Sequence, residues 1–332
     1  MATEKSLLFV NHLVGRGDRV PAQLMFQHHR SLEAVSTENS WLTIGVFDGA
    51  HRGHQEIVHQ LTAGAHANGA PAVLLTFAPH PALVLGGVEI KCLTTPDERA
   101  SLLADMGVDV VITYPFDKQT AALSPEEFMA RLKEHTALKK LLVGYDFSMG
   151  RNRAGNVPRL TEIGRNLGYD VLPVAALQLD GQIVSSTLIR QQIGDGDVAA
   201  AAIRLGRSYM VSGTVIRGDG RGRTIGIPTA NLDVPLEKAI PANGVYACWA
   251  GVGDQKRKAV VNIGLRPTFN SGPVLPRVEA HLLDYDADLY DQTITLEFVE
   301  RLRGEQKFPG IDALVAQIKA DIGKTNDILS PK

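Results

Sequence analysis

One stretch near the N-terminus, LTIGVFDGAHRGH at residues 42–54, carries most of the information about the architecture. Residues 42–47 form a short apolar run that ends at Asp48-Gly49, which predicts a buried strand followed by a turn. Residues 55–68 then carry apolar side chains at helical spacing. A strand that runs directly into a helix is typical of an open α/β sheet, in which ligands bind outside the carboxyl ends of the strands.

The alternation of strand and helix continues from a first strand near Gln23 to about residue 190. Two helices have clear start signals, Thr95-Pro96-Asp97-Glu98 and Ser124-Pro125-Glu126-Glu127, in which Glu follows the capping hydroxyl by three residues. Further strands are predicted at residues 72–77, 109–114, 140–144 and 170–177. This pattern predicts an α/β domain with a doubly wound parallel sheet.

The pattern changes after about residue 207. Strands are predicted at residues 210–216, 244–252, 256–263, 278–283 and 293–300, with intervening loops too short for helices. This predicts an antiparallel, Greek-key-like β-barrel, closed by one helix over residues 311–322. We therefore divide the chain into a mobile leader at 1–22, an α/β domain at 23–193, a linker with a short helix at 194–207, and a β domain at 208–332.

Composition narrows the class of protein. A length of 332 residues suits about two domains. The net charge of −2 argues against nucleic-acid binding. Cys92 and Cys248 are too few for a disulfide framework or a four-ligand zinc site, so we interpret them as buried thiols in a reducing cytosol. Because no apolar run approaches the roughly 18 residues of a membrane span, and residues 6–14 lack a cleavage site, we expect a cytoplasmic protein with no membrane partner.

The turn at the end of the first quoted stretch has the composition of a phosphate site. Gly45, Gly49 and Gly53 would let a phosphate approach the backbone at a helix N-terminus. His51 and His54 share one face of the first helical turn, where imidazole N–H groups could hold ATP phosphates and stabilise a leaving pyrophosphate. Polar cap residues are the alternative, and two histidines in this spacing make it the weaker one. The fingerprints GxGxxG and GK[ST] are absent here.

Two further motifs suit phosphate. Ser186, Thr187 and Arg190 stand at the start of a short helical stretch and could bind an anion, although such a run is also an ordinary helix cap. Residues 213–231 hold five glycines and three arginines and predict a cationic lid over a polyphosphate. The lid residues that we single out are Gly218, Gly220, Gly222, Arg223 and Gly226.

Thr229 and Asn231 follow this lid on an extended segment, so they point to one face. Their neutral oxygens could help to bind Mg²⁺ together with phosphates. A solvated hairpin loop is the alternative for the lid, and the sequence Pro-Thr-Ala-Asn taken alone would favour it.

These motifs carry a family resemblance. Residues 43–54, 76–81, 144–150 with 153–155, and 185–190 resemble the nucleotidylyltransferase superfamily, and in particular the adenylyltransferase module of bacterial bifunctional riboflavin kinase/FAD synthetases. Residues 213–231, 243–246, 262–269, 278–283 and 301–303 resemble the riboflavin kinase module of the same family. Together the two resemblances cover nearly all of residues 25–322. The leader and the long segment 270–276 depart from the family pattern.

The resemblance implies that the first domain transfers AMP from ATP to FMN, forming FAD and pyrophosphate. The attacking group is already a phosphate oxygen, so no strong general base is required. By this match the ATP site comprises His51 and His54, the surrounding Gly45, Phe47, Asp48, Gly49 and Gly53, and Ser186, Thr187 and Arg190. His80 and Asp146 fall in segments that would line the nucleotide and flavin pockets.

The resemblance also implies that the second domain phosphorylates riboflavin. Thr229 and Asn231 would bind Mg²⁺ and ATP, and Glu279 would accept the proton of the ribityl 5′-hydroxyl. Glu279 lies on an alternating strand, opposite in direction to Val278 and Ala280. Without the resemblance, an exposed strand glutamate would be the better interpretation. Arg303 and the C-terminal helix would flank the flavin.

We therefore expect a bifunctional enzyme of FAD biosynthesis, a monomer or weak homo-oligomer, with riboflavin, FMN and ATP as its partners and Mg²⁺ as its metal. Two alternatives stay open. The first domain could bind nucleotide without turnover, leaving a kinase only. The chain could also be a flavin-binding sensor or carrier that consumes no ATP.

Overall fold

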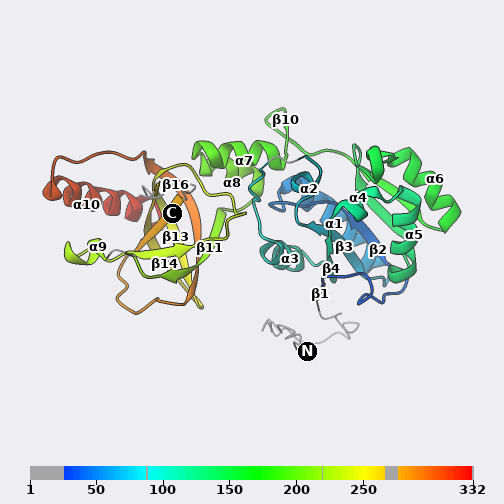
Figure 1. Cartoon of the computed structure of the whole chain (residues 1–332), viewed down its shortest axis with the longest axis horizontal. Coiled ribbons are helices and arrows are strands. Elements are labelled where there is room, and N and C mark those ends of the chain that lie inside the picture. The colour runs from blue at the N-terminus through cyan, green and yellow to red at the C-terminus, as the bar shows by residue number, and fades with distance from the viewer. Residues whose placement is uncertain (1–25, 87–88, 219, 266–275, 331–332) are drawn as a thin grey trace.

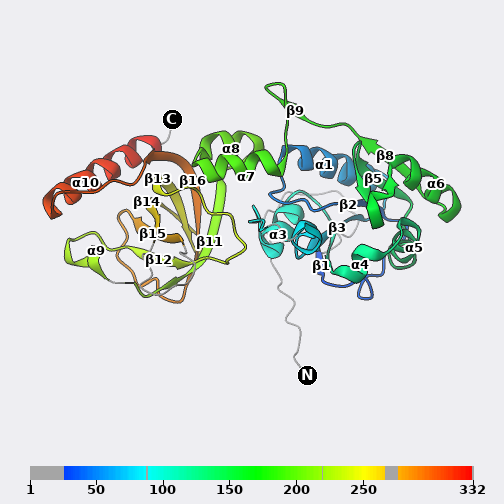
Figure 2. The same ribbon diagram turned by 45° about the horizontal axis from the view of Figure 1, so that its top comes forward.

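The computed structural model describes residues 26–86, 89–218, 220–265 and 276–330. The chain forms a parallel-sheet unit and a barrel unit that lie side by side, with helices α7 (Ser186–Asp195) and α8 (Val198–Leu205) between them in both views (Figures 1 and 2). The predicted leader over residues 1–22 and the turn at Arg266-Pro267-Thr268 lie outside the described residues, as does Gln23, where we expected the first strand.

The first unit has the predicted doubly wound sheet. Its six strands are all parallel and lie in the order β1-β4-β3-β2-β5-β8. Their bounds are β1 Gln27–His29, β2 Trp41–Ile44, β3 Ala72–Ala78, β4 Val110–Pro115, β5 Lys140–Gly144 and β8 Asp170–Val174. The chain passes from β2 to β3 and β4 on one side and then crosses to β5 and β8 on the other. This reversal at β2 creates the crevice in which such sheets bind ligands.

Helices cover both faces of this sheet, as predicted. The two predicted capping boxes form at Thr95 and Ser124. The helices are α1 Arg52–Ala67, α2 Pro81–Gly86, α3 Pro96–Asp105, α4 Lys118–Ala122, α5 Pro125–Thr136 and α6 Val157–Leu167. Helix α6 was not predicted from the sequence, although Asn156 caps it and Gly168 ends it with a φ of 74°. Short hairpins pair β6 (Ser148–Met149) with β7 (Gly155–Asn156) and β9 (Gln178–Leu179) with β10 (Gln182–Ile183), and the 3₁₀ turn η1 is Arg151–Arg153.

The second unit is the predicted antiparallel barrel. It is closed in the order β11-β12-β15-β14-β13-β16. The strands are β11 Tyr209–Ile216, β12 Ala230–Asp233, β13 Gly244–Val252, β14 Gln255–Leu265, β15 Pro276–Leu282 and β16 Thr293–Arg303. A short helix α9 (Arg221–Thr224) lies in the glycine- and arginine-rich loop. Helix α10 (Ile311–Ile328) extends beyond its predicted end at residue 322, and Thr325 in the extension is fully buried.

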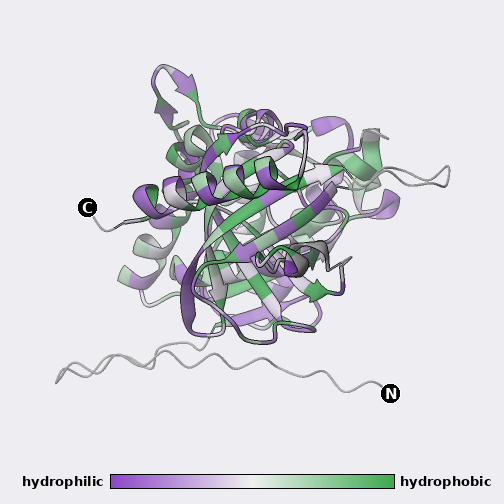
Figure 3. Cartoon of the chain, turned by 90° about the vertical axis from the view of Figure 1, so that its left-hand side faces the viewer, coloured by the Kyte–Doolittle hydropathy of each residue, from purple (hydrophilic) through white to green (hydrophobic). Residues whose placement is uncertain are grey.

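A continuous core joins the barrel to the helices beside it. Ile189 and Ile193 of α7 and Ala201 of α8 are buried in one cluster with barrel residues such as Phe298. The stretch at residues 194–207, expected to be a linker, therefore lies against the barrel. Figure 3 shows hydrophobic and hydrophilic residues interspersed along the barrel strands, as alternation between core and surface requires. Of the helices in the described ranges, none combines the length and the apolarity that crossing a membrane demands.

Candidate active sites

A cavity of about 900 Å³ opens at the carboxyl ends of the parallel strands. Its walls come from the segments after β2, β3, β5 and β8 and from the start of α7. Its position is the crevice at which the strand order reverses, and its volume suits a nucleotide-sized ligand. The segment after β2 and the start of α7 carry the two motifs that were predicted as phosphate sites.

The cavity brings together nearly all of the residues predicted for the first site. Those on its wall are Gly45, Phe47, Asp48, His51, Gly53, His54, His80, Asp146, Ser186, Thr187 and Arg190. Gly49 lies behind them. Its N–H donates to Thr94 Oγ1 at 3.0 Å, its carbonyl accepts from Arg207 at 2.8 Å, and its φ of +80° suits glycine.

The two histidines form a stacked pair at the start of α1. Their ring centroids are 3.6 Å apart with an interplanar angle of 13°. His51 Nδ1 accepts the His54 backbone N–H at 3.3 Å, so the neutral His51 ring carries its proton on Nε2. Burial lowers the pKa of His51 to about 4, although nearby Asp48 opposes this change. Burial and the neighbouring His51 hold the pKa of His54 well below its ordinary value.

Both imidazoles are therefore neutral near pH 7 and can act as hydrogen-bond donors. The Nδ1 atom of His54 is buried and has no hydrogen-bond partner among the residues that the structure describes. The loop before them is strained, because Phe47 and Ala50 adopt φ values of 51° and 41°. The centroid of the Phe47 ring lies 4.9 Å from that of the His54 ring, and the two rings are tilted by 51°.

Asp48 holds this loop from inside the protein. Its side chain is 1% exposed. Its carboxylate accepts the N–H groups of Leu93 and Thr94, each at 3.0 Å, and the Arg190 guanidinium at 2.8 Å. Burial alone would raise the pKa of this carboxyl, but the Leu93 amide, Arg99 and Arg190 together lower it below its ordinary value. Asp48 is thus an anchored anion whose acceptors are occupied by protein groups.

The loop after β2 also holds the start of α7, on the cavity wall. The Ser186 hydroxyl donates to the Asp48 carbonyl at 2.9 Å, which fixes the start of α7 against the loop. His80 Nδ1 accepts the Ala82 N–H at 3.1 Å, and burial lowers its pKa.

Arg99 is a buried residue that holds the loop after β2, and it was not predicted from the sequence. Its guanidinium donates to the Val46 carbonyl at 2.5 Å and to Thr76 Oγ1 at 2.8 Å. A detectable signal was present, because Arg99 precedes the buried Leu103 by four residues and so lies on the inward stripe of α3.

The predicted site of the barrel is a row of side chains across three strands. Glu279 on β15 is paired directly with Asn231 on β12 and with Asn262 on β14. Directly paired residues share a face of a sheet. The adjacent Val278 and Ala280 are buried in the core, so this row lies on the outer face of the barrel.

The guanidinium of Arg277 lies beside the oxygens of Asn231 and Glu279. Arg277 Nε donates to Asn231 Oδ1 at 2.7 Å, and its guanidinium is 3.1 Å from Glu279 Oε1. The Asn262 amide is 3.5 Å from the other Glu279 oxygen. Because a guanidinium already occupies the space between Asn231 and Glu279, the chemistry of this donor set fits a positive ion.

The glycine-rich lid approaches this row closely. A Cβ on Gly218 would collide with the Asn231 amide, and one on Gly222 would collide with the Ile227 carbonyl and lie 3.5 Å from Thr229 Oγ1. Gly220 and Gly226 adopt positive φ values of 70° and 76°. The lid and the predicted Mg²⁺ ligands are therefore in contact.

Arg303 has a different set of neighbours. Its guanidinium makes a bidentate ion pair with the buried Asp321 of α10, with Nη2 to Oδ2 at 2.8 Å. The ring centroid of Phe308 is 5.8 Å away. Arg303 thus joins the barrel to the C-terminal helix.

Comparison with known proteins accounts for both units. The family model described as FAD synthetase matches residues 33–188, and the one described as riboflavin kinase matches residues 205–329. The chain belongs to the bifunctional riboflavin kinase/FMN adenylyltransferase family. A member of that name from Escherichia coli is 37% identical and one from Bacillus subtilis is 34% identical, with 88% and 89% of this chain and 93% and 94% of theirs covered.

One solved structure resembles the whole bifunctional enzyme. It is a crystal structure of a protein named macrolide-efflux protein from Streptococcus pneumoniae, 30% identical, with a TM-score of 0.83 over 91% of this chain and 99% of that one. The predicted family, fold and two activities of FAD biosynthesis are thereby confirmed. The parallel-sheet unit is the FMN adenylyltransferase and the barrel is the riboflavin kinase.

Proposed function

We propose that the cavity of the parallel-sheet unit converts FMN and ATP into FAD and pyrophosphate, and that the outer row of the barrel converts riboflavin and ATP into FMN. The observation that carries this division is the different design of the two sites. The cavity offers neutral donors, while the barrel row places Glu279 beside Asn231.

In the cavity, an FMN phosphate oxygen attacks the α-phosphorus of ATP, and the bond from that phosphorus to the bridging oxygen of pyrophosphate breaks. The nucleophile is already ionised, so no proton has to be removed. His51 donates from Nε2 and His54 from its ring, which stabilises charge on the leaving pyrophosphate. Gly45 and Gly53 leave room for the phosphates, Thr187 and the first amides of α7 contact them, and Asp48 positions Arg190.

The flavin would lie in the same cavity. His80 and Asp146 follow β3 and β5, the strands on either side of β2, and both side chains line the cavity. His80 keeps Nε2 for a ligand because its Nδ1 is engaged with Ala82. We propose these two residues as flavin contacts.

In the barrel, Glu279 accepts the proton of the ribityl 5′-hydroxyl while that oxygen attacks the γ-phosphorus of ATP, and ADP leaves. Thr229 and Asn231 would hold Mg²⁺, which when bound neutralises charge on the ATP phosphates. Arg277 has to leave Asn231 for this to happen. Gly218, Gly220, Gly222, Arg223 and Gly226 form the lid over the phosphates, and Arg303 orients α10 beside the flavin.

Location and assembly belong to this proposal too. We propose a cytoplasmic enzyme, which the two free and buried thiols of Cys92 and Cys248 support because oxidising compartments favour disulfides. We also keep the prediction of a monomer or weak homo-oligomer without nucleic-acid or membrane partners.

A single incubation tests the proposal. Purified protein is mixed with riboflavin, ATP and Mg²⁺, and the flavins are separated and quantified over time. FMN that appears first and is then converted to FAD supports both sites. Accumulation of FMN alone would reduce the cavity to a binding role. Tight flavin binding without ATP consumption would identify a carrier and reject both assignments.

A further inference from the structure

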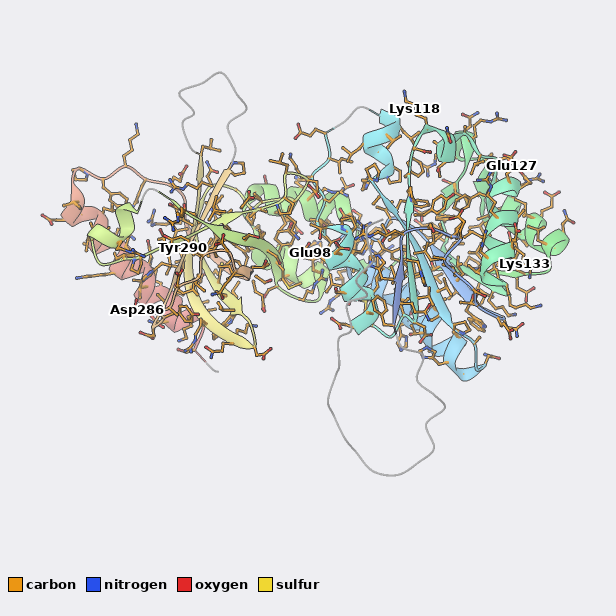
Figure 4. All side chains as sticks on the ribbon, turned by 60° about the horizontal axis from the view of Figure 1, so that its bottom comes forward. Glu98, Lys118, Glu127, Lys133, Asp286 and Tyr290 are labelled. Carbon is orange, nitrogen blue, oxygen red and sulfur yellow. The ribbon has the colours of Figure 1, made fainter. Side chains whose placement is uncertain are left out.

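Lys238 is a buried cation that neither proposed reaction uses. It lies between β12 and β13 of the barrel unit and is 3% exposed. Its ammonium donates to the Leu93 carbonyl at 2.8 Å and pairs with Glu98 of α3 at 2.5 Å. Figure 4 labels Glu98 and shows that Glu98 lies where the two units meet. Lys238 of the barrel unit thus contacts the parallel-sheet unit. Its ammonium needs these partners, because a buried charge without a partner is energetically costly.

The main chain around Lys238 extends this contact. Cys92 and Lys238 form a parallel β-bridge between the units. The Cys92 N–H donates to the Glu237 carbonyl at 2.6 Å, and the Ala239 N–H donates to the Cys92 carbonyl at 2.8 Å. The segment Cys92–Thr94 is therefore held along one edge by the barrel unit.

The other edge of this segment binds Asp48 through the same peptide groups. The peptide between Cys92 and Leu93 accepts at its carbonyl from Ala239 and donates its N–H to Asp48 Oδ2. The peptide between Leu93 and Thr94 accepts from Lys238 Nζ and donates to Asp48 Oδ1. Consecutive hydrogen bonds of this kind polarise one another in a low-dielectric interior. Two adjacent peptide groups thus connect the barrel to the carboxylate that anchors the histidine loop.

We infer that Lys238 of the riboflavin kinase unit is a positioning residue for the FMN adenylyltransferase reaction. It acts through the Leu93–Thr94 peptide on Asp48, and through Asp48 on Arg190 and the loop that carries His51. The kinase unit is then a structural part of the adenylyltransferase site. This inference rests on the proposed function, because it takes the cavity as the place where FAD is made.

The test compares two lysines that both donate across the junction. Lys238→Met removes the donor that leads to Asp48. Lys91→Met is the matched control, because Lys91 Nζ donates to the Leu236 carbonyl at 2.9 Å without contacting the Asp48 network. Both reactions are measured on each preparation, with FMN supplied directly for the second one, and kcat and KM are determined separately.

We expect Lys238→Met to lower kcat for FAD formation about tenfold or more, because small misplacements of catalytic groups have effects of this size. The KM for FMN and the riboflavin kinase rate should stay within about twofold, and Lys91→Met should change neither reaction. In an Asp48→Asn background, adding Lys238→Met should have no further effect, since both changes interrupt one path.

Three results would overturn the inference. One is a normal FAD rate in Lys238→Met, a second is an additive effect in the Asp48→Asn background, and the third is a parallel loss of both reactions in Lys238→Met and Lys238→Gln, which would make Lys238 a folding residue. Failure of the proposed function itself is separate, because the unmodified protein would then make no FAD from FMN.

Discussion

Asp48 and Arg190 are 142 residues apart in the sequence, and the buried Asp48 carboxylate forms an ion pair of 2.8 Å with the partly exposed Arg190 guanidinium. The pair joins the loop after β2 to helix α7, and the Ser186 hydroxyl reinforces it by donating to the Asp48 carbonyl. Two motifs that look independent in the sequence are therefore one structure. Whatever disturbs Asp48 must also disturb the arginine that faces the cavity.

Arg190→Gln should lower FAD formation by about 100-fold, because it removes a charged donor from the cavity and releases Asp48. Loss of one charge-assisted bond should lower the free energy of unfolding by about 2 kcal/mol, with the riboflavin kinase rate unchanged. Steady-state kinetics and urea unfolding measure both. The control is Arg159→Gln, since Arg159 on α6 makes exposed ion pairs with Glu126 of α5 and Glu162 of α6. Equal behaviour of the two variants would contradict the assignment of Arg190.

Glu279→Gln should lower FMN formation by about 10²–10⁴-fold, the usual contribution of a general base. Conversion of supplied FMN to FAD should be unaffected. Glu297→Gln is the matched control, because Glu297 is also a barrel-strand glutamate and is paired with Lys256 on the surface. A riboflavin kinase assay with product separation distinguishes the two. If Glu279→Gln kept its kinase activity, the base would have to be another group.

Gly218→Ala should reduce riboflavin kinase activity strongly, because the added Cβ would overlap the Asn231 amide. The change moves either the lid or the proposed Mg²⁺ ligand, so the KM for Mg-ATP should rise. Gly323→Ala in α10 meets no atom within 4 Å and should leave the rate unchanged. It should raise stability by about 0.5–1 kcal/mol, as expected for alanine in a helix. A Gly218→Ala enzyme with normal KM would show that the lid tolerates a side chain.

The stability of the parallel-sheet unit should fall as the pH is lowered from 6.5 towards 4. The pKa of His51 is lowered to about 4 in the folded protein, so the unfolded chain takes up its proton first. This contribution is fully present above pH 6.5 and should weaken by about 2 kcal/mol between pH 7 and pH 5. His54 acts in the same direction.

Urea unfolding at both pH values tests this prediction. A Trp249→Phe background leaves Trp41, on β2, to report on the parallel-sheet unit. His51→Asn is the control, because asparagine keeps an N-cap acceptor and cannot titrate. The pH dependence should be smaller in this variant. An identical slope in both proteins would mean that other groups dominate.

Much of the fold follows from local signals. The capping boxes at Thr95 and Ser124 start their helices as predicted, because both reciprocal hydrogen bonds involve residues within one turn. The alternation of Val278, Glu279 and Ala280 places Glu279 outside the barrel, because successive side chains of a strand point to opposite faces of the sheet. Helix α6 was missed although it has cap residues at both ends.

The composition of the candidate sites was also readable from the sequence. The spacing of His51 and His54 is a property of one helical turn, so their shared face could be predicted. The neutral state of the two rings could not, because it depends on burial by residues distant in the chain. Arg99 and Thr94 were missed because they lie in the connection between β3 and β4, which is distant in the sequence from the loop after β2. Thr94 binds the Asp48 carboxylate, and Arg99 binds the Val46 carbonyl.

Local sequence was thus sufficient for most of the secondary structure, for the two architectures and for most of the residue types at each site, since these depend on neighbours within a few positions. Only the tertiary structure brought Asp48 to Arg190, placed Arg277 between Asn231 and Glu279, and inserted Lys238 beside Leu93. Those contacts join residues far apart in the chain. Their energies come from desolvation and charge pairing in a packed interior, which no local pattern encodes.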